Sequence, residues 1–541
     1  MEKIYLMAVD LGTTFIKAAV YDTEGTQISS ARAAVISDSS RPGVFLQSGT
    51  EIYRSVLAAM KSAAQTAGSD ISARIDAIGF TGQMAGFMGV DRDWNDITSW
   101  SCSLDTRYVP YANEQMQTLK QQFLDICGTN APLMSAKCKW FVSDFPEEAS
   151  KVAQYMLISS YVIGRLGKVD IEKASLGSSY LTWTGLADIR SRTWSSELCE
   201  ASGVSRDVLP EIVDYHAVSG YLSDEAASEL GLPSGIPLVA GAGDKIAGCI
   251  GAGILSLGDT IFEASSYGAV SVLAEGYAPN PQRYDYDAIP AAESGRYYLH
   301  KYLPGSGITL QWFLDTFGAP DVKTANAAQE SNAGQASNPG QASNSGQAVL
   351  NAAQALDAFR AMEDAISRIP CGSEGLMAVG LLGGSAMPFD GEIRGTWVGH
   401  TWSHTKAHFY RALLESFAYE LRGTMDSISH MYPEWNRFGD VKIIGGGASS
   451  DTWRQILADV TGCSFLNYSG YDAALWGTAV LAGKGIGLFD DLKSASGAAR
   501  LKGVSAPIRE DQIAYEKYMA IYEQLTAHMH PICEKLLAIE K

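Results

Sequence analysis

The chain has 541 residues, of which 46% are hydrophobic and 19% are charged, a composition typical of globular proteins. Its length predicts at least two domains, because a single hydrophobic core rarely serves more than about 300 residues. The formal net charge of −19 at pH 7 disfavours binding to nucleic-acid phosphates or anionic membranes, so we expect neither as a partner.

The cysteines and the apolar stretches predict a cytoplasmic protein. The 8 cysteines are scattered without a CxxC pair, so neither a zinc site nor a disulfide framework is predicted. Near the N-terminus, Asp10 interrupts the only candidate for the apolar region of a secretory signal. The stretch 236–261 is rich in small and apolar residues, but Asp244, Lys245 and Asp259 make it a poor membrane span.

The first predicted elements are two strands joined by a tight turn, in the sequence MAVDLGTTFIKAAVYD. The first strand ends in Asp10, which can hold Mg²⁺ directly or through water. Gly12 permits the bend, Thr13 and Thr14 can offer N–H and O–H donors to a phosphate, and Lys17 can reach one. No GxxxxGK[ST] loop is present. A hairpin with a capping aspartate is the structural alternative, and this segment alone does not decide between the two.

Apolar strands that run into glycine-rich turns recur at residues 75–82, 236–244 and 441–449. Several such turns in one α/β chain indicate a nucleotide cleft, because their backbone N–H groups can bind phosphate oxygens. The second of them delivers Asp244 to the start of a small-residue helix. A carboxylate there can accept a proton from a substrate hydroxyl during phosphoryl transfer. A helix N-cap is the structural alternative for Asp244.

A compositionally biased segment follows in the second half of the chain. Residues 324–349 form a near-hexapeptide repeat of Asn, Gly, Gln, Ala and Ser, which predicts a disordered surface insertion. A helix is expected to resume after it and to run toward Ile369.

The segment SHTKAHFYRALLESFAYELRGTM is the clearest amphipathic helix, with Ser403 or Thr405 available as N-cap. His400, His404 and His408 recur every four residues at its start. Because the helix is expected to begin after His400, the three imidazoles should not share a face, and we do not expect them to bind a metal.

Taken together and in order, these motifs resemble the FGGY carbohydrate kinases, a family within the actin/hexokinase/Hsp70-like ATPase superfamily. The resemblance covers nearly the whole chain outside the repeat. The segments that carry it, in chain order, are DLGTTFIKAAVYD, GFTGQMAG, SLDTR, SAKCKW, GAGDKIAG, SSYG, GSGITLQW, GTWVGHTWSHTKAHFYRALLE and IIGGGASSDTWRQILADVTG.

The resemblance implies an α/β fold of two RNase H-like domains, as in actin-like ATPases, with a deep cleft between them. It places the N-terminal domain, with the phosphate hairpin and the sugar site, at residues 1–245. The C-terminal domain, with the adenosine site and the repeat insertion, is expected at residues 246–541. Closure of the cleft would exclude water from the reaction. ATP, Mg²⁺ and a sugar are the implied ligands, and a homodimer is compatible with the resemblance.

The family pattern also implies roles for individual residues. Asp10 is expected at the metal, and Asp244 is expected to act as the general base on the sugar hydroxyl. The expected sugar contacts are Gln83, Met84, Ala85, Asp105, Arg107, Asp244 and Lys245. The expected ATP contacts are Gly12, Thr13, Thr14, Lys17, Ser265, Ser266, Gly268, Gly307, Gln311, Gly446, Gly447 and Asp451.

Four features depart from the family pattern. Ala85 stands where xylulokinases carry a histidine, which removes a hydrogen-bonding partner for the sugar. Lys245 stands where relatives carry a neutral residue, and it can lower the pKa of Asp244 or bind an acidic sugar group. Tyr267 replaces a small residue of the second phosphate loop, and GLLGGSAMPFD stands in place of a GERTP-like stretch.

The sequence therefore predicts an enzyme that phosphorylates a sugar hydroxyl with ATP and releases a sugar phosphate and ADP. A ketopentose such as xylulose is the expected substrate. Ribulose, gluconate, glycerol and fuculose are the alternatives within this enzyme class. Outside this class, the alternatives are a sugar-binding regulator that has lost catalytic activity and, third, a chaperone or actin-like filament protein.

Overall fold

The computed structural model describes residues 3–540 apart from 266, 283, 304, 319–358, 388, 391, 434–437, 469–470 and 496–500. The predicted insertion at 324–349 therefore lies outside the described residues. The chain forms two compact units, each built from separate stretches of sequence. Unit 1 is Met1–Ile261, Ser271–Lys301 and Gly470–Arg500, and unit 2 is Phe262–Val270, Tyr302–Ser469 and Leu501–Lys541. The domain division between residues 245 and 246 stays a prediction.

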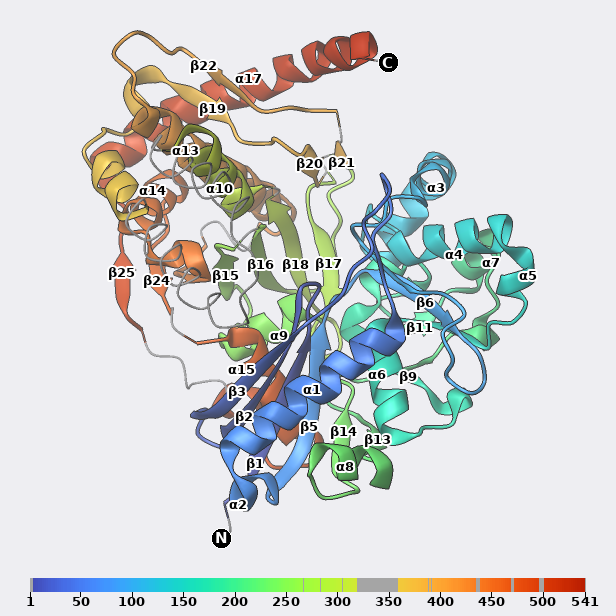
Figure 1. Ribbon diagram of the computed structural model, residues 1–541. Helices are drawn as coiled ribbons and strands as arrows, with labels where there is room; N and C mark the ends of the chain where they lie inside the picture. Colours follow the sequence, from blue (N-terminus) through green and yellow to red (C-terminus); the bar gives the residue numbers. More distant parts are fainter. Residues whose placement is uncertain are drawn as a thin grey trace, which may run out of the picture. The chain divides into compact units, whose positions relative to one another are not determined.

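A six-stranded mixed sheet forms the core of unit 1 (Figure 1). In sheet order its strands are β13 (Val218–Tyr221), β14 (Pro237–Val239), β5 (Ile75–Gly82), β1 (Tyr5–Leu11), β2 (Phe15–Asp22) and β3 (Gln27–Ala34). The predicted hairpin is confirmed as β1 and β2, which pair antiparallel, while β5 pairs parallel with β1. Every residue of β1 is buried, so the hairpin belongs to the core of unit 1. Its turn lies at the end of two inner strands of the sheet.

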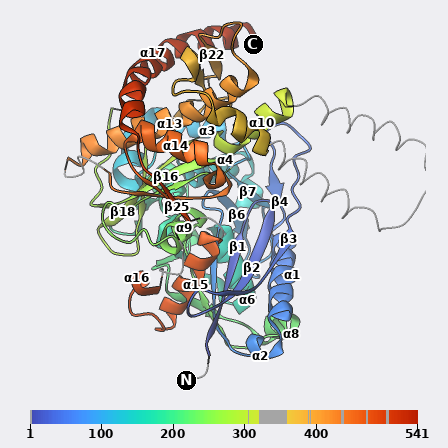
Figure 2. The same cartoon turned by 90° about the vertical axis from the view of Figure 1, so that its left-hand side faces the viewer.

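Helices cover both faces of this sheet. On one face, α1 (Gly49–Ala67) packs against β2 and β3, and on the other, α15 (Ala473–Gly485) packs against β1 and β5 (Figure 2). A third helix, α9 (Asp244–Gly251), packs in turn against α15.

The contact between α9 and α15 depends on glycine. A Cβ atom on Gly251 would lie 2.0 Å from the carbonyl oxygen of Ala473, and one on Gly477 would lie 1.9 Å from that of Ala247. The two helix backbones therefore touch, which no larger residue at these two positions would allow. This close contact explains why both helices are rich in small residues.

A second sheet of unit 1 consists, in order, of β4 (Leu46–Gln47), β7 (Trp100–Cys102), β6 (Gly86–Val90) and β8 (Gln154–Met156). Against it pack α4 (Leu133–Asp144) and α6 (Ile158–Gly167), and α3 (Val109–Gln122) packs on α4. The remaining helices and strands of unit 1 are α2 (Ser69–Ser72), α5 (Pro146–Ala149), β9 (Ser175–Gly177), β10 (Ala187–Asp188), β11 (Thr193–Trp194), α7 (Ser196–Ala201), β12 (Glu211–Val213), α8 (Asp224–Leu230), β17 (Asp287–Pro290) and α16 (Leu492–Ala495).

Unit 2 is built around a group of packed helices and a short run of strands. Helix α13 (Lys406–Met431) packs against α14 (Asp451–Thr461), α10 (Ser306–Phe317) and the long α17 (Arg509–Glu540), drawn in red in Figure 1. β24 (Phe465–Asn467) pairs parallel with β23 (Val441–Ile444) and antiparallel with β25 (Gly503–Ser505). Two further antiparallel pairs are β19 (Met377–Val379) with β22 (Thr396–Val398), and β20 (Ser385–Ala386) with β21 (Phe389–Asp390).

Three of the points at which the chain passes from one unit to the other lie within strands. These are β15 (Thr260–Glu263), β16 (Gly268–Glu275) and β18 (Arg296–Leu303).

The predicted amphipathic helix is confirmed as α13, and Thr405 is its N-cap. The backbone N–H of Thr405 donates to Nδ1 of His408 (3.1 Å), while Nδ1 of His404 accepts from the backbone of Thr401 (2.8 Å). Both imidazoles thus accept hydrogen bonds from nearby backbone N–H groups at the start of the helix. In the described part of the chain, no helix is long and apolar enough to span a bilayer.

We expect Gly251→Ala to destabilise the protein, because the new methyl group would overlap the backbone of α15. Overpacking of this kind costs about 1–3 kcal/mol, and the melting temperature should fall accordingly. Gly248→Ala in the same helix is the control, since nothing lies within 4 Å of its Cβ position. The alanine there should leave the melting temperature unchanged or raise it, because Ala favours helix over Gly by about 1 kcal/mol. Equal effects of the two substitutions would contradict the close helix contact.

Candidate active site

Two carboxylates and one ammonium group meet at the hairpin of unit 1. Asp10 is the penultimate residue of β1 and lies opposite Lys17 in the β1–β2 register. Lys17 Nζ is 3.5 Å from Asp10 Oδ2 and donates a hydrogen bond to Asp472 Oδ2 at 3.0 Å. Asp472 is the N-cap of α15. Lys17 therefore bridges a strand at the start of the chain and a helix near its end.

The electrostatics of this cluster favour an added cation. Burial raises the pKa of Asp10 to about 7; Lys17 opposes this rise, whereas Asp244 and Asp472 add to it. Lys17 is itself disfavoured as a cation by burial, yet Asp10 and Asp472 raise its pKa overall. Asp10 and Asp472 thus act on Lys17, while Asp244 acts on Asp10, and a second positive charge would stabilise the ionised form of Asp10.

The turn between the two strands presents hydroxyl groups. A Cβ on Gly12 would lie 2.6 Å from the carbonyl oxygen of Phe15, so the tight turn requires glycine. The carbonyl oxygen of Thr13 accepts a hydrogen bond from Gln47 (2.7 Å), and that of Thr14 accepts one from Val35 (2.9 Å). These bonds hold the turn through its backbone and leave the two threonine side chains able to contact a ligand.

Asp244 is positioned by the turn that follows β14 and by Gly243. It is the first residue of α9, and the N-cap is Gly243, so the alternative of Asp244 as the N-cap residue is wrong. Its Oδ1 accepts the backbone N–H of Lys245 at 2.7 Å. A Cβ on Gly243 would lie 2.2 Å from Cγ of Met84, which brings the end of β5 against the turn before Asp244.

The predicted sugar residues Asp105 and Arg107 form a close ion pair after β7, with Arg107 Nη2 2.7 Å from Asp105 Oδ2. Asp105 is buried, and its carboxylate accepts hydrogen bonds from Arg107 Nε (2.9 Å) and Nη2 (2.7 Å). These bonds, together with one from Ser101, keep the pKa of Asp105 below its usual value despite burial. Gln83 lies nearby in the fold and accepts a hydrogen bond from Nε1 of Trp100 (3.2 Å).

Unit 2 contains a cavity of about 620 Å³ between α10, α13 and the turn after β23. It brings together the predicted ATP contacts Ser265, Gly307, Gln311, Gly446 and Gly447. Gly268 and Asp451 do not line it, since Gly268 packs on Ser306 and Asp451 pairs with Arg454. Ser266 lies outside the described residues.

Sequence reasoning missed several residues of these sites. Asp472 lies at the start of a helix rich in small residues, as Asp244 does. This shared sequence pattern could have indicated Asp472 as a site residue. In the cavity of unit 2, Glu363 accepts hydrogen bonds from Ser450 Oγ (2.7 Å) and from the backbone of Thr452 (2.8 Å). Glu363 carries no sequence signal, because only the tertiary fold brings it to the start of α14.

Comparison with known proteins identifies a family over most of the chain. A model of the N-terminal domain of the FGGY family of carbohydrate kinases matches residues 5–251, and a model of the C-terminal domain of that family matches residues 272–486. The chain therefore belongs to the FGGY family of carbohydrate kinases. It is a carbohydrate kinase, and ATP is its phosphoryl donor.

Individual relatives agree with this assignment. The xylulose kinase of Bacillus subtilis (strain 168) is 25% identical over 548 residues, which cover 99% of each chain. The crystal structure of gluconate kinase from Lactobacillus acidophilus has a TM-score of 0.84 at 21% identity and covers 99% of this chain and 100% of that one. Plasmodium falciparum glycerol kinase with ADP has a TM-score of 0.81 at 18% identity, covering 97% of this chain and 98% of that one. The fold is the two-domain α/β fold of actin-like ATPases, as predicted.

We expect Asp10→Asn to raise the melting temperature of the ligand-free protein at pH 8.5. The pKa of Asp10 rises on folding from 3.8 to about 7, so folding favours the protonated form. Stability is therefore lost as the pH rises from about 4 to 7, and above pH 7 the charged carboxylate destabilises the fold by up to about 4 kcal/mol.

An asparagine removes this penalty, so its advantage should be smaller at pH 6 than at pH 8.5. The exposed Asp70→Asn is the control and should change the melting temperature equally little at both pH values. A loss of stability in Asp10→Asn at pH 8.5 would show that the ion pair with Lys17 outweighs the cost of burial.

Proposed function

We propose that this kinase transfers the γ-phosphoryl group of ATP to a hydroxyl group of a ketopentose such as xylulose and releases a sugar phosphate and ADP. The observation that carries the proposal is the cluster of Asp10, Lys17 and Asp244 in unit 1, in which Asp244 is close enough to raise the pKa of Asp10. The resemblance to xylulose kinase along the full chain supports the choice of sugar.

Asp244 is the proposed general base. As the sugar oxygen attacks the γ-phosphorus, its proton passes to the Asp244 carboxylate and the bond from the γ-phosphorus to the ADP oxygen breaks. Lys17 and the side chains of Thr13 and Thr14 are the proposed donors to the phosphate oxygens. Since these groups are held by the core hairpin, they are oriented before the nucleotide binds.

The carboxylates of unit 1 fit a magnesium ion as an ATP companion. Hard oxygen donors are the ligands that Mg²⁺ prefers, and Mg²⁺ usually takes only one or two carboxylates beside water and phosphate oxygens. Asp10 would hold it, consistent with the absence of any three-residue metal cluster among the described residues. When bound, Mg²⁺ offsets negative charge on the phosphoryl groups.

The cavity of unit 2 is the proposed site of the nucleoside. Its glycines Gly307, Gly446 and Gly447 let a ligand approach the backbone, and the side chains of Tyr410 and Trp453 add aromatic surface. A volume of about 620 Å³ lies within the usual range for small-molecule sites. Gly268, Ser266 and Asp451 remain proposed ATP contacts from the family pattern.

Other sugars remain alternatives because of Ala85 and Lys245. Ala85 cannot donate the hydrogen bond of a histidine, and Lys245 adds a cation beside the proposed base. An acidic sugar such as gluconate is therefore the most informative competitor of xylulose, followed by ribulose, glycerol and fuculose. We also propose that the enzyme acts in the cytoplasm, without nucleic-acid or membrane partners, and that it forms a homodimer.

The first test is ADP release, measured with a coupled assay over a panel of ketoses, polyols and sugar acids. We expect xylulose to give the largest rate and Asp244→Asn to lower kcat by about 10²–10⁴-fold, the usual contribution of a general base. Asp70→Asn, on the surface of unit 1, should retain the wild-type rate. If a sugar binds but none accelerates ADP release, the regulator is the better interpretation.

A second substitution tests the nucleoside site. Gly446→Val should raise the KM for ATP at least about tenfold, because the new side chain fills the cavity while nothing of the protein lies within 4 Å of its Cβ. The KM for the sugar should stay within a factor of two. Gly439→Val, equally unobstructed but outside the cavity, is the matched control. An unchanged KM for ATP in Gly446→Val would place the nucleoside elsewhere.

A further inference from the structure

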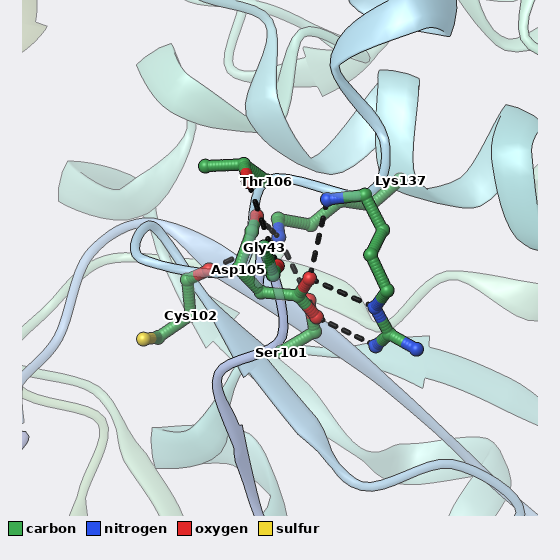
Figure 3. Close-up of polar contacts among 7 residues, drawn as sticks. Gly43, Ser101, Cys102, Asp105, Thr106 and Lys137 are labelled. Atoms are coloured by element: carbon green, nitrogen blue, oxygen red, sulfur yellow. Dashed lines mark hydrogen bonds and ion pairs between the residues drawn. The ribbon is translucent and has the colours of Figure 1, made fainter. Parts of the chain in front are cut away.

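A buried lysine that sequence reasoning did not assign supports the end of β7 and the loop after it. Lys137 lies on α4, and its side chain is fully buried. Its Nζ donates hydrogen bonds to Ser101 Oγ (2.7 Å), to the carbonyl oxygen of Cys102 (3.0 Å) and to that of Asp105 (3.0 Å). An ammonium group has three N–H donors, so all three are used on this one loop (Figure 3).

The hydrogen bond from Lys137 also directs the hydroxyl of Ser101. Because Ser101 Oγ accepts from Lys137, its own hydrogen is free to point elsewhere, and it donates to Asp105 Oδ2 at 2.8 Å. Asp105 therefore receives Ser101 and the two guanidinium nitrogens of Arg107 on its two oxygens. With these acceptor positions occupied, the carboxylate serves to orient Arg107 rather than to bind a ligand itself.

Arg107 is the member of this group that can reach a ligand. Its side chain is 28% exposed, whereas those of Asp105 and Lys137 are buried. Its guanidinium lies 4.6 Å from the ring centroid of Trp140, which fixes the plane of the group. In the described part of the chain, Arg107 Nη1 donates to no protein acceptor, so its N–H groups are available to sugar hydroxyl or carboxylate oxygens.

We propose that Lys137 is a positioning residue for the sugar: it fixes the loop from Ser101 to Asp105, and through it the direction in which Arg107 presents its guanidinium. This inference rests on the proposed function, because it assumes that the loop faces the sugar. Lys137 itself does not touch the ligand, since it is fully buried beneath the loop.

The burial of Lys137 makes its positioning role dependent on pH. Burial lowers the pKa of Lys137 to about 8; Asp105 opposes the shift, and the positive charge of Arg107 adds to it. The other groups that face it do not titrate nearby: burial raises the pKa values of Cys102 and Cys138 above the usual thiol value and that of Tyr108 to about 12, and the pKa of Asp105 is lowered. Above about pH 8, the neutral amine has only two N–H donors, and one of the three loop contacts is lost.

The test compares Lys137→Met with Lys139→Met, a neighbour on α4 whose Nζ pairs with the exposed Glu114 (2.9 Å). With D-xylulose as the probe, we expect Lys137→Met to raise the KM for the sugar at least about tenfold, with the KM for ATP within twofold of wild type. Lys139→Met should change neither. The wild-type KM for the sugar should rise above pH 8, and that of Lys137→Met should be flat from pH 7 to 9.5.

An unchanged KM for the sugar in a folded Lys137→Met protein would overturn the proposal, as would equal increases in both KM values. If Lys137→Met does not fold, Ser101→Ala decides the question. This substitution removes the hydroxyl that accepts from Lys137 and donates to Asp105, while the lysine side chain stays packed. A rise in the KM for the sugar alone supports the proposal, and wild-type values for both substrates contradict it. The proposed function fails separately, when the wild-type enzyme phosphorylates no sugar of the panel.

Discussion

Lys17 lies between the carboxylates of Asp10 and Asp472, which are more than 450 residues apart in sequence. The three groups are partly or fully removed from water, so each carboxylate depends on the lysine and on any cation that a ligand brings. The hairpin can hold this charge because β1 is buried along its whole length in the middle of a sheet. The proposed catalytic side chains are therefore held by the rigid core, which keeps carboxylates together that would repel one another in a flexible loop.

Close backbone contacts keep this cluster in place. Glycines at 251 and 477 let α9 and α15 touch, and Gly79 lets α15 lie directly on β5, where a Cβ would be 2.7 Å from the carbonyl oxygen of Thr478. The two helices that begin with Asp244 and Asp472 are thus fixed to the same sheet as Asp10. Small residues in such helices have no side chain to pack, and their use here is explained by the close approach that they permit.

The two proposed ligand regions offer a ligand different kinds of interaction. In unit 1, the loop that we propose to face the sugar is held by charged groups that pair with one another away from water, with the buried Lys137 beneath it and Arg107 at its surface. In unit 2, glycine backbone and aromatic rings line the cavity, and among its described lining residues the half-buried acid Glu363 accepts hydrogen bonds at the start of α14. A partly apolar cavity fits the proposed nucleoside site, whereas charged groups such as those of unit 1 fit the proposed contacts to phosphates.

The sequence by itself determined the class of fold, the hairpin with Asp10, the strand that leads to Asp244, the amphipathic helix α13 and the family, because each depends on residues that are close together in the chain. Local apolar periodicity and glycine-rich turns are readable at that range. The tertiary structure alone decided that Asp472 binds Lys17, that Glu363 reaches α14 and that Lys137 supports the loop of Asp105. These pairs join residues between 32 and 455 positions apart, and an ion pair or a buried hydrogen bond leaves no periodic trace in sequence. Their partners are set by packing, so only the folded chain identifies them.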